Sequence, residues 1–508
     1  MRAATRYDDQ SYIDYSVDSV TIKDFFDQEF IHFSNYDNIR SIPCAIDGLK
    51  PTQRKVLYGM LKNNQVNEIK VSQLTGRIAE MSNYHHGEAS LVETICGMAQ
   101  DHLGTNNVNY LVPEGQFGSR YIYTALEKLT RFLFREEDDQ ILEYIKDEGV
   151  MIEPVTYYPI LPTALFNGAT GIGTGWSTDV PCYHPLEVAD ALEKIIAGDT
   201  TTRFHLLPFY DGFRGPITCD EDDVVTVSGV WRVQSDRVEI FELPVCRDGP
   251  DDFITEITKK FSTQSGNNDR NERLLFIKDI DNLSTESKVH IVLHCDKEKL
   301  YNLEKREGGV AKLLRLNATV RTSNMWMFEP GTRLRKFEDT DQIIRYFYKI
   351  RRVQYQRRKD YQINALKQKI MTMTYRFIEY VMQGKLKLFN REKLERLSKS
   401  IEEAKGGVKR LEELIGTTID QLWTRDIQEF RNAYVEFHKK KCDKYGSPVH
   451  PKGERVPPME VKSEQRRPIG AHQTIAEKKK CERQKVIHYS TEQELEDLAL
   501  IEVKTTTS

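Results

Sequence analysis

Apolar residues recur at helical spacing in three short stretches near the start of the chain. These stretches are Thr52–Leu61, Val71–Met81 and Leu91–His102, and each predicts a short amphipathic helix. Arg54 is expected to lie off the apolar face of the first helix. Three short helices followed by glycine-rich turns are typical of a helix-turn-helix or winged-helix domain, although many small helical cores share this outline.

Between residues 200 and 340, the hydrophobic pattern changes from helical spacing to alternation. Apolar and polar positions alternate in Val224–Val233, Val238–Leu243 and Val289–Cys295, which are also rich in β-branched residues. This period of two predicts strands, and the region is interpreted as a mixed α+β domain.

Long helices are predicted from residue 341 to residue 440. Apolar residues step by three and four from Ile363 to Tyr380, which is the spacing of a coiled-coil seam. A second helical stretch runs from Val408 to Phe437. The two stretches either form an antiparallel arm or pack as ordinary helices, and the pattern leaves both interpretations open.

Both ends of the chain are polar. The first 35 residues carry an apolar patch, Phe25, Phe26, Phe30 and Ile31, that is expected to dock on the next domain. From Lys439 to Lys485 there are 14 Lys/Arg against 6 Asp/Glu, with several prolines, which predicts a disordered basic tail. Its cluster at Lys478–Lys480 is either a nuclear-import or DNA-contact patch or ordinary solvated charge.

Composition narrows the class of protein. The 508 residues, 39% apolar and 30% charged, indicate a soluble chain of about three or four domains. No apolar run is long enough for a membrane span, and the polar start predicts an intracellular protein. Eight scattered cysteines without a C-x-x-C pair argue against a disulfide scaffold or a structural zinc site. Because the net charge is −4, nucleic-acid binding would have to come from local charge.

The stretch GQFGSRYIY, residues 115–123, holds the strongest candidate chemistry. Its two glycines let the backbone approach a ligand closely, ahead of Arg120 and Tyr121. A tyrosine can attack phosphorus as a nucleophile, and an adjacent arginine stabilises the charge that develops. Alone, this pair is more often a buried aromatic ring beside a surface arginine.

Other motifs each have a plainer interpretation. His85 and His86 with Glu88 suggest a metal site, but no third ligand follows at a suitable spacing, so core packing or a phosphate contact is favoured. The GATGIGTG run lacks the strand-then-helix setting of a dinucleotide loop, and a turn that exposes Ile172 fits better. Three D-x-D pairs are interpreted as solvated surface charge. No metal ligand is therefore predicted.

Four further motifs surround GQFGSRYIY in a fixed order. They are RSIP at 40–43, DGLKPTQRK at 47–55, AEMSNYHHGE at 79–88 and NGATGIGTGW at 167–176. Together the five motifs closely resemble the breakage–reunion region of eukaryotic-type DNA topoisomerase II, strongly over residues 37–176 and more weakly to about residue 437. The resemblance implies an α+β architecture with a lead-in segment (1–35), a winged-helix DNA-gate domain (36–195), a tower-like domain (196–340), a coiled-coil arm (341–438) and the basic tail (439–508).

The resemblance also implies roles for single residues. Tyr121 matches the tyrosine that attacks a DNA phosphodiester and becomes linked to the 5′ phosphate, Arg120 matches its transition-state partner, and His86 matches a histidine that stabilises the reacting phosphate. Four residues are expected to contact DNA: Arg40, Lys50, Arg54 and Ile172. The three basic residues would hold the backbone and the isoleucine would wedge between base pairs.

The chain departs from the family pattern in three places. Ser119 joins the GQFG glycines directly to Arg120, where family members have a longer stretch. Neither an ATPase domain nor an acidic metal-binding domain is recognised, so Mg²⁺ and ATP are expected to bind a partner chain. The segment between Leu397 and Ile419 lacks the globular cap that closes the lower dimer gate in family members.

Two functions remain open at this point. One is a DNA-gate enzyme of the type II DNA topoisomerase class, not active alone, which acts as a homodimer or with a partner that supplies ATPase and metal-binding parts. The other is a catalytically inactive paralogue that binds DNA or chromatin; a viral or otherwise reduced enzyme is a third interpretation. The expected location is the nucleus, with viral or cytoplasmic settings as alternatives.

Overall fold

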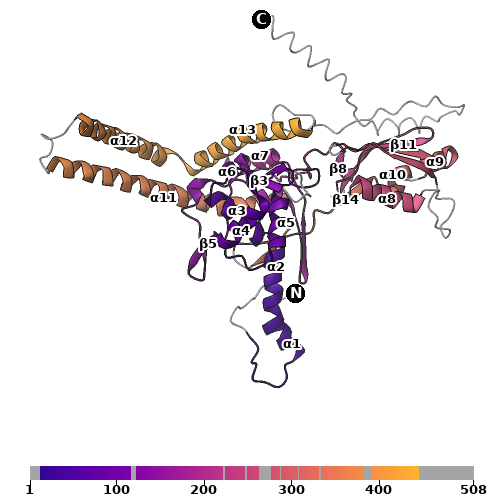
Figure 1. Ribbon diagram of the computed structural model, residues 1–508, viewed down its shortest axis with the longest axis horizontal. Helices are drawn as coiled ribbons and strands as arrows, with labels where there is room; N and C mark the ends of the chain where they lie inside the picture. Colours follow the sequence, from indigo (N-terminus) through magenta and orange to yellow (C-terminus); the bar gives the residue numbers. More distant parts are fainter. Residues whose placement is uncertain are drawn as a thin grey trace, which may run out of the picture. The chain divides into compact units, whose positions relative to one another are not determined.

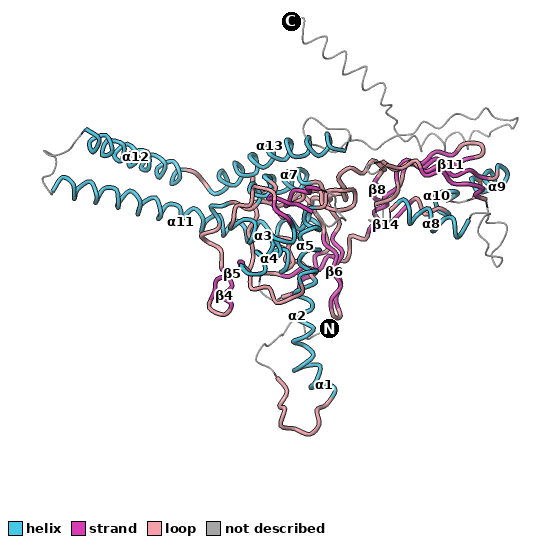
Figure 2. Tube along the Cα trace, viewed as in Figure 1, coloured by secondary structure: helices cyan, strands magenta, loops and turns pink. Residues whose placement is uncertain are grey.

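The computed structural model describes residues 12–115, 122–220, 224–245, 249–261, 276–285, 288–306, 308–330, 333–382 and 391–445. The chain divides into two compact units, coloured by sequence in Figure 1 and by secondary structure in Figure 2. The first unit is Met1–Asp101, Thr105–Leu206 and Thr322–Lys440, and the second is His102–Gly104, Leu207–Arg321 and Lys441–Ser508. Helices and strands are mixed, so the expected α+β class is confirmed. No described helix is long and apolar enough to cross a bilayer.

The first unit contains the predicted three-helix motif. Its helices are α3 (Pro51–Lys62), α4 (Val71–Met81) and α5 (Glu88–Ala99). A three-stranded antiparallel sheet accompanies them, in the order β1 (Ile69–Lys70), β3 (Ile122–Leu126), β2 (Leu111–Gly115). The third helix ends earlier than expected because Gln100 already has an extended ψ of 135°. Helices and sheet together give the outline of a winged-helix domain.

The chain before this motif forms three consecutive helical segments, α1 (Ile22–Phe25), the π-helix η2 (Phe26–Phe30) and α2 (Ile31–Ser41). No residue of α1 or η2 is buried. The rings of Phe25 and Phe26 are about half exposed and contact one another and Phe30. The docking of these rings on the next domain, expected from the sequence, is therefore not found in the described chain.

The rest of the first unit surrounds one large apolar core. Its remaining elements are α6 (Lys128–Leu133), η3 (Glu136–Asp138), β4 (Tyr144–Asp147), β5 (Val150–Pro154), η4 (Thr163–Leu165), β6 (Ala169–Gly173), β7 (Trp176–Val180), α7 (Pro185–Ile196), β15 (Met325–Phe328) and β16 (Leu334–Phe337). The strands pair as the antiparallel hairpins β4–β5, β6–β7 and β15–β16. The core also includes Phe347 and Tyr355, which lie far along the chain in the first part of the long helix α11 (Thr340–Met382).

Long helices follow: α11 (Thr340–Met382), α12 (Arg391–Gly416) and α13 (Ile419–Tyr445). Helices α11 and α12 lie side by side in Figure 1. Lys359 bonds the carbonyl oxygens of Ile415 and Thr417, whereas Ile370, further along α11, packs against Gly407, earlier in α12. The two helices are therefore antiparallel. The coiled-coil arm stays a prediction, because antiparallel packing fits both interpretations that the pattern left open.

The second predicted helical stretch is in fact two helices. It breaks at Thr417 and Thr418, where the Thr418 hydroxyl accepts from the Gln421 amide and the Gln421 side chain accepts from the Thr418 amide. This reciprocal pair is a capping box, which begins a new helix. Helix α13 then returns to the core, where Trp423 is fully buried and donates to the carbonyl of Ile160 at 2.8 Å.

The second unit has its own apolar core and two sheets. Its strands are β8 (Ile217–Cys219), β9 (Val225–Ser228), β10 (Val230–Val233), β11 (Arg237–Glu242), β12 (Ile277–Asn282), β13 (Ile291–Cys295) and β14 (Asn317–Val320). They form the sheets β10-β11-β13-β12 and β14-β9-β8, packed with α8 (Pro250–Phe261), α9 (Lys297–Glu304) and α10 (Gly309–Leu313). All three predicted strand regions are present. The first is divided at Gly229, where a Cβ atom would lie 2.4 Å from the carbonyl oxygen of Glu242.

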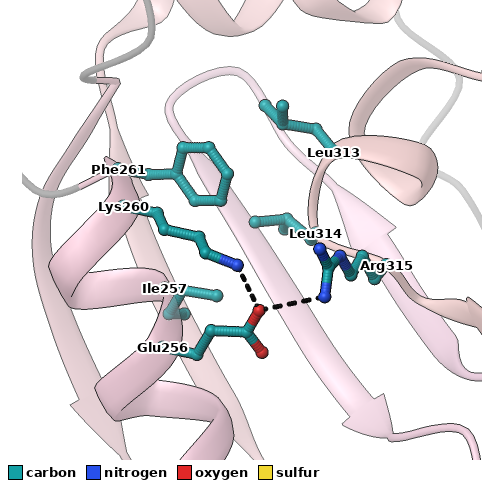
Figure 3. Close-up of a pocket in the computed structure, with 7 residues that line it drawn as sticks. All are labelled: Glu256, Ile257, Lys260, Phe261, Leu313, Leu314 and Arg315. Atoms are coloured by element: carbon teal, nitrogen blue, oxygen red, sulfur yellow. Dashed lines mark hydrogen bonds and ion pairs between the residues drawn. The ribbon is translucent and has the colours of Figure 1, made fainter. Parts of the chain in front are cut away.

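A pocket of about 280 Å³ lies in this unit, between α8 and the turn after α10 (Figure 3). Apolar side chains line it, and Glu256 bonds both Lys260, at 2.5 Å, and Arg315, at 3.3 Å. Its charges are thus already paired within the chain.

The predicted disordered tail lies almost wholly outside the described residues, which end at 445. The domain boundaries derived from the sequence also stay a prediction.

Candidate nucleic-acid interface

A hairpin of β6 and β7 presents one large apolar side chain to solvent. Ile172 is 86% exposed, next to a turn in which Gly175 has a φ of +79°. Ile172 is the register partner of Ser177, one pair from the end of the ladder. Ile172 is thus exposed, as the sequence predicted, but it lies at the end of strand β6 and not in the turn itself.

The hairpin is fixed against α2 by close backbone contact. A Cβ atom at Gly171 would lie 2.1 Å from the carbonyl oxygen of Ser41, and one at Gly173 would lie 2.3 Å from the Oδ1 of Asn38. At Gly171 any larger residue would clash with the backbone of α2, since real Cβ atoms do not approach so closely. At Gly173 a larger residue would displace the Asn38 side chain. The two glycines therefore allow β6 and α2 to pack closely.

Side chains of α2 also hold the tip of the hairpin. The carbonyl oxygen of Thr174 accepts hydrogen bonds from Asn38 Nδ2 at 3.1 Å and Ser34 Oγ at 3.3 Å. The Thr174 hydroxyl in turn donates to Asp37 at 2.7 Å. These three bonds keep the exposed Ile172 in one position relative to α2.

Two of the predicted basic residues border this hairpin. Lys50, which immediately precedes α3, donates from Nζ to the carbonyl oxygen of Thr170 on β6 at 2.9 Å, and partial burial lowers its pKa. Arg40 is exposed at the last turn of α2. Both cations thus lie on segments that contact the strand carrying Ile172.

His86 joins the same region from the turn between α4 and α5. Its Nε2 lies 2.9 Å from the hydroxyl oxygen of Tyr36 on α2, and its ring packs edge-on against Tyr84. Burial lowers the pKa of His86, and the charges of Arg40, His85 and Lys55 lower it further. The neutral imidazole is therefore favoured near neutral pH, with one nitrogen donating and the other accepting.

Arg120 and Tyr121 lie outside the described residues, in the segment 116–121. The residues on either side are described. Gly115 ends β2 and is the register partner of Ile122, which begins β3. On the other side of β3, Lys70 pairs with Tyr123. The two strands thus bring the ends of this segment together beside a basic residue.

Comparison with known proteins identifies the family. The family model for the A subunit of DNA gyrase/topoisomerase IV matches residues 40–449, which is most of the chain. The chain belongs to this family. The motifs that resembled a breakage–reunion region lie almost entirely inside the matched range.

Named relatives agree with the family model. DNA topoisomerase 2 of Penicillium chrysogenum is 37% identical over 400 residues, which cover 75% of this chain and 24% of the relative. The mitochondrial DNA topoisomerase 2 of Dictyostelium discoideum is 38% identical over 397 residues, covering 75% and 30%. The chain therefore spans about a quarter of the length of the curated relatives it matches.

A solved structure agrees as well. The crystal structure of the Plasmodium falciparum topoisomerase II DNA-binding, cleavage and re-ligation domain matches with a TM-score of 0.75 and 31% identity. The match covers 86% of this chain and 67% of that one. The gyrase/topoisomerase fold therefore extends over both described units.

In this member of the gyrase/topoisomerase family, Arg54 does not lie where the sequence predicted, off the apolar face of its helix. It is buried, and its guanidinium bonds Asp47 at 2.8 and 3.0 Å and the carbonyl oxygen of Leu49 at 3.1 Å. The expectation that Arg54 lies off the apolar face is wrong, because its side chain turns inward to a carboxylate that is itself fully buried. Burial alone lowers the pKa of Arg54, but Asp47 more than compensates and raises it overall. The DNA-contact role of Arg54 stays a prediction, without support from this placement.

Pattern analysis missed Asp47 and Tyr36. Asp47 holds several segments together. In addition to its bonds with Arg54, its carboxylate accepts hydrogen bonds from the backbone amides of Leu49 and Tyr157, both at 3.0 Å. Its only sequence signal was the D-G turn that precedes Lys50, which indicates a bend and not a buried carboxylate. Tyr36 gave no signal, since its partner lies 50 residues away.

Proposed function

We propose that this chain binds duplex DNA and cleaves it transiently, with Tyr121 becoming linked to the 5′ phosphate. One observation carries the proposal: three groups are tied to the hairpin that exposes Ile172. Lys50 bonds Thr170 of that hairpin, Arg40 lies on α2, which packs against it, and His86 bonds Tyr36 of the same helix. Cations that meet phosphates and an apolar wedge that meets base steps are the two parts of a DNA-bending site.

The division of labour follows from the chemistry of each group. Lysine and arginine contact backbone phosphates and fix the position of the duplex without reading its sequence. An apolar side chain inserted between base pairs unstacks them at a cost of a few kcal/mol, which the extra contacts of the bent duplex offset. Ile172 loses no packing when it leaves water, because it is already exposed.

The proposed cleavage step is an exchange of phosphodiester bonds. The phenol oxygen of Tyr121 forms a bond to phosphorus as the bond to the 3′ oxygen breaks; the phenol loses its proton and the 3′ hydroxyl gains one. Arg120 and His86 are proposed to stabilise the charge on the phosphate oxygens during this exchange. Religation is the reverse exchange, so no net energy input is needed for the chemistry.

Mg²⁺ and ATP are proposed to bind a partner chain. Within the described ranges no group of three or more His, Cys, Asp or Glu side chains is placed to hold a metal ion. The described residues thus offer no set of ligands for a metal ion, and no step above passes through one. A homodimer, or a heterodimer with a chain that supplies the ATPase and metal-binding parts, is the assembly we propose.

The decisive measurement is a covalent adduct. The full chain is incubated with duplex DNA, Mg²⁺ and, in trans, the part of the Dictyostelium relative that this chain does not match. We expect protein attached to DNA 5′ ends, and we expect Tyr121→Phe to abolish it because phenylalanine lacks the attacking oxygen.

Two controls complete this test. Tyr123→Phe, two residues along in β3, removes a neighbouring hydroxyl and is expected to leave adduct formation intact. Duplex binding without any adduct, with the wild-type chain and the added part present, would favour a catalytically inactive DNA-binding protein.

We infer a nuclear location from the proposed substrate. Because one relative is mitochondrial, a fluorescent fusion of the full chain in living cells decides between the two compartments.

A further inference from the structure

We propose that Tyr36 is a positioning residue for His86: its hydroxyl donates to Nε2 and thereby holds the imidazole in the tautomer whose Nδ1–H can donate to a phosphate oxygen. The inference rests on the proposed cleavage function and adds to it a residue that neither the motifs nor the family match assigns.

The contact joins two separate elements. Tyr36 lies on α2 and His86 lies 50 residues later, yet the hydroxyl oxygen and Nε2 are 2.9 Å apart. The Tyr36 side chain is 54% exposed, so it is not held in place by burial in a core. Within the described ranges its hydroxyl bonds the imidazole. Ordering an exposed tyrosine in this way costs side-chain entropy that the hydrogen bond must offset.

The imidazole ring is fixed by a second aromatic residue. Tyr84 packs against His86 with ring centroids 5.3 Å apart and an interplanar angle of 71°, the favoured edge-to-face arrangement. Tyr36 lies at 6.3 Å and 42°. The Tyr36 hydroxyl occupies Nε2, and no hydrogen bond to Nδ1 is found among the described residues. Nδ1 is therefore the nitrogen that the proposal assigns to the phosphate oxygen.

The surroundings of the ring favour its neutral form. Burial is the main cause that lowers the pKa of His86, and electrostatic interactions with Arg40 on α2, His85 in the same turn and Lys55 on α3 lower it further. A neutral imidazole has two tautomers, and a hydrogen bond to one nitrogen decides which is populated. A phenol that donates to Nε2 selects the proton on Nδ1.

The consequence for catalysis depends on pH. Above the pKa of His86, loss of the Tyr36 hydroxyl lets the ring populate the tautomer that carries no proton on Nδ1. Below that pKa, the imidazolium carries protons on both nitrogens and donates from Nδ1 whether or not Tyr36 is present. A positioning role therefore predicts a defect that disappears in acid, whereas a structural role predicts a defect at every pH.

The test compares Tyr36→Phe with the wild-type full chain in the adduct assay at two pH values, one above and one below the pKa of His86. That pKa lies below the ordinary histidine value of about 6.5 and is read from the pH dependence of the ¹⁵N shifts described next. At the higher pH we expect adduct formation to slow by roughly three- to tenfold, the range that one neutral hydrogen bond supplies. At the lower pH we expect the ratio of the two rates to approach one. Tyr15→Phe is the matched control, since the Tyr15 hydroxyl bonds Glu29 at 2.8 Å in the same N-terminal region.

A second readout does not depend on activity. In the ¹⁵N-histidine-labelled full chain, with His86→Gln used to assign the signal, the nitrogen shifts report which ring nitrogen carries the proton. We expect the Nδ1–H tautomer in the wild type and a mixture in Tyr36→Phe. An unchanged tautomer, or an equal rate defect at both pH values, would overturn the inference. If the wild type forms no adduct but the tautomer still depends on Tyr36, the proposed cleavage function is wrong. Tyr36 then positions His86 without contributing to cleavage.

Discussion

At the scale of single residues, the buried pair of Asp47 and Arg54 orders the backbone from which Lys50 extends. Asp47 is fully buried and binds Arg54 through two hydrogen bonds as well as the amides of Leu49 and Tyr157. Burial of a carboxylate is costly unless hydrogen-bond donors such as these compensate it. Arg54 thus supports the backbone of the site, whereas Lys50 and Arg40 are the cations proposed to contact DNA.

Removal of Arg54 is expected to damage the fold more than the DNA contact. Arg54→Ala leaves Asp47 buried without its counter-ion, which costs about 3–5 kcal/mol in the free energy of unfolding. Urea unfolding of the full chain measures it. The matched control is Arg352→Ala, whose partner Asp420 is exposed; it is expected to cost about 0–1 kcal/mol. Wild-type stability with weaker DNA binding in Arg54→Ala would instead restore the phosphate role.

At the scale of elements, the β6–β7 hairpin is a rigid support for one exposed side chain. Two glycines let α2 approach the strand, and three hydrogen bonds from α2 hold the turn at Thr174. On the other side, Trp176 packs against Trp326 with ring centroids 4.5 Å apart. A wedge must be held firmly if it is to separate base pairs rather than bend away.

Ile172→Ala should therefore separate DNA bending from stability. We expect the bend angle, measured by energy transfer between the labelled ends of a bound duplex, to decrease because the side chain no longer fills the opened base step. The free energy of unfolding should change by less than about 0.5 kcal/mol, since the residue is exposed. Val150→Ala, an exposed β-branched residue on a different hairpin, serves as the control. An unchanged bend in Ile172→Ala would rule out the wedge.

Much of this element structure could be predicted because it depends on neighbours along the chain. Helix α4 has the bounds that its periodicity gave, and the turn after Ile172 follows from its glycines. The break before α13 was missed, although Gly416 and the pair Thr418 and Gln421 carry the signal for it, a helix stop followed by a capping box. The inward turn of Arg54 and the bond from Tyr36 to His86 were not readable, because each depends on a partner that folding brings close.

At the scale of the whole molecule, the chain has two separate apolar cores, and each core stabilises its own unit. One core runs from the winged-helix region through α7 to α11 and α13, and the other joins the sheet of β10 to β13 with α8 and α9. The first core thus gathers residues from widely separated parts of the sequence, whereas the second is formed by one continuous stretch.

Core substitutions should therefore act on one unit at a time. Leu57→Ala and Leu293→Ala each remove a fully buried side chain, from the first and second core respectively, and each is expected to cost about 2–5 kcal/mol. Hydrogen exchange under increasing urea should show the loss of protection confined to the unit that carries the change. Equal loss in both units from either variant would show one cooperative unit instead.

Helix α2 carries the supports of the hairpin and the partner of His86 within two turns. Ser34, Asp37 and Asn38 contact the turn at Thr174, while Tyr36 and Arg40 act on the imidazole. In the proposed complex, a duplex that resists kinking would strain the hairpin and, through α2, the backbone that aligns the histidine. Base steps that deform easily would leave this alignment undisturbed, so their flexibility would influence where a strand is cut.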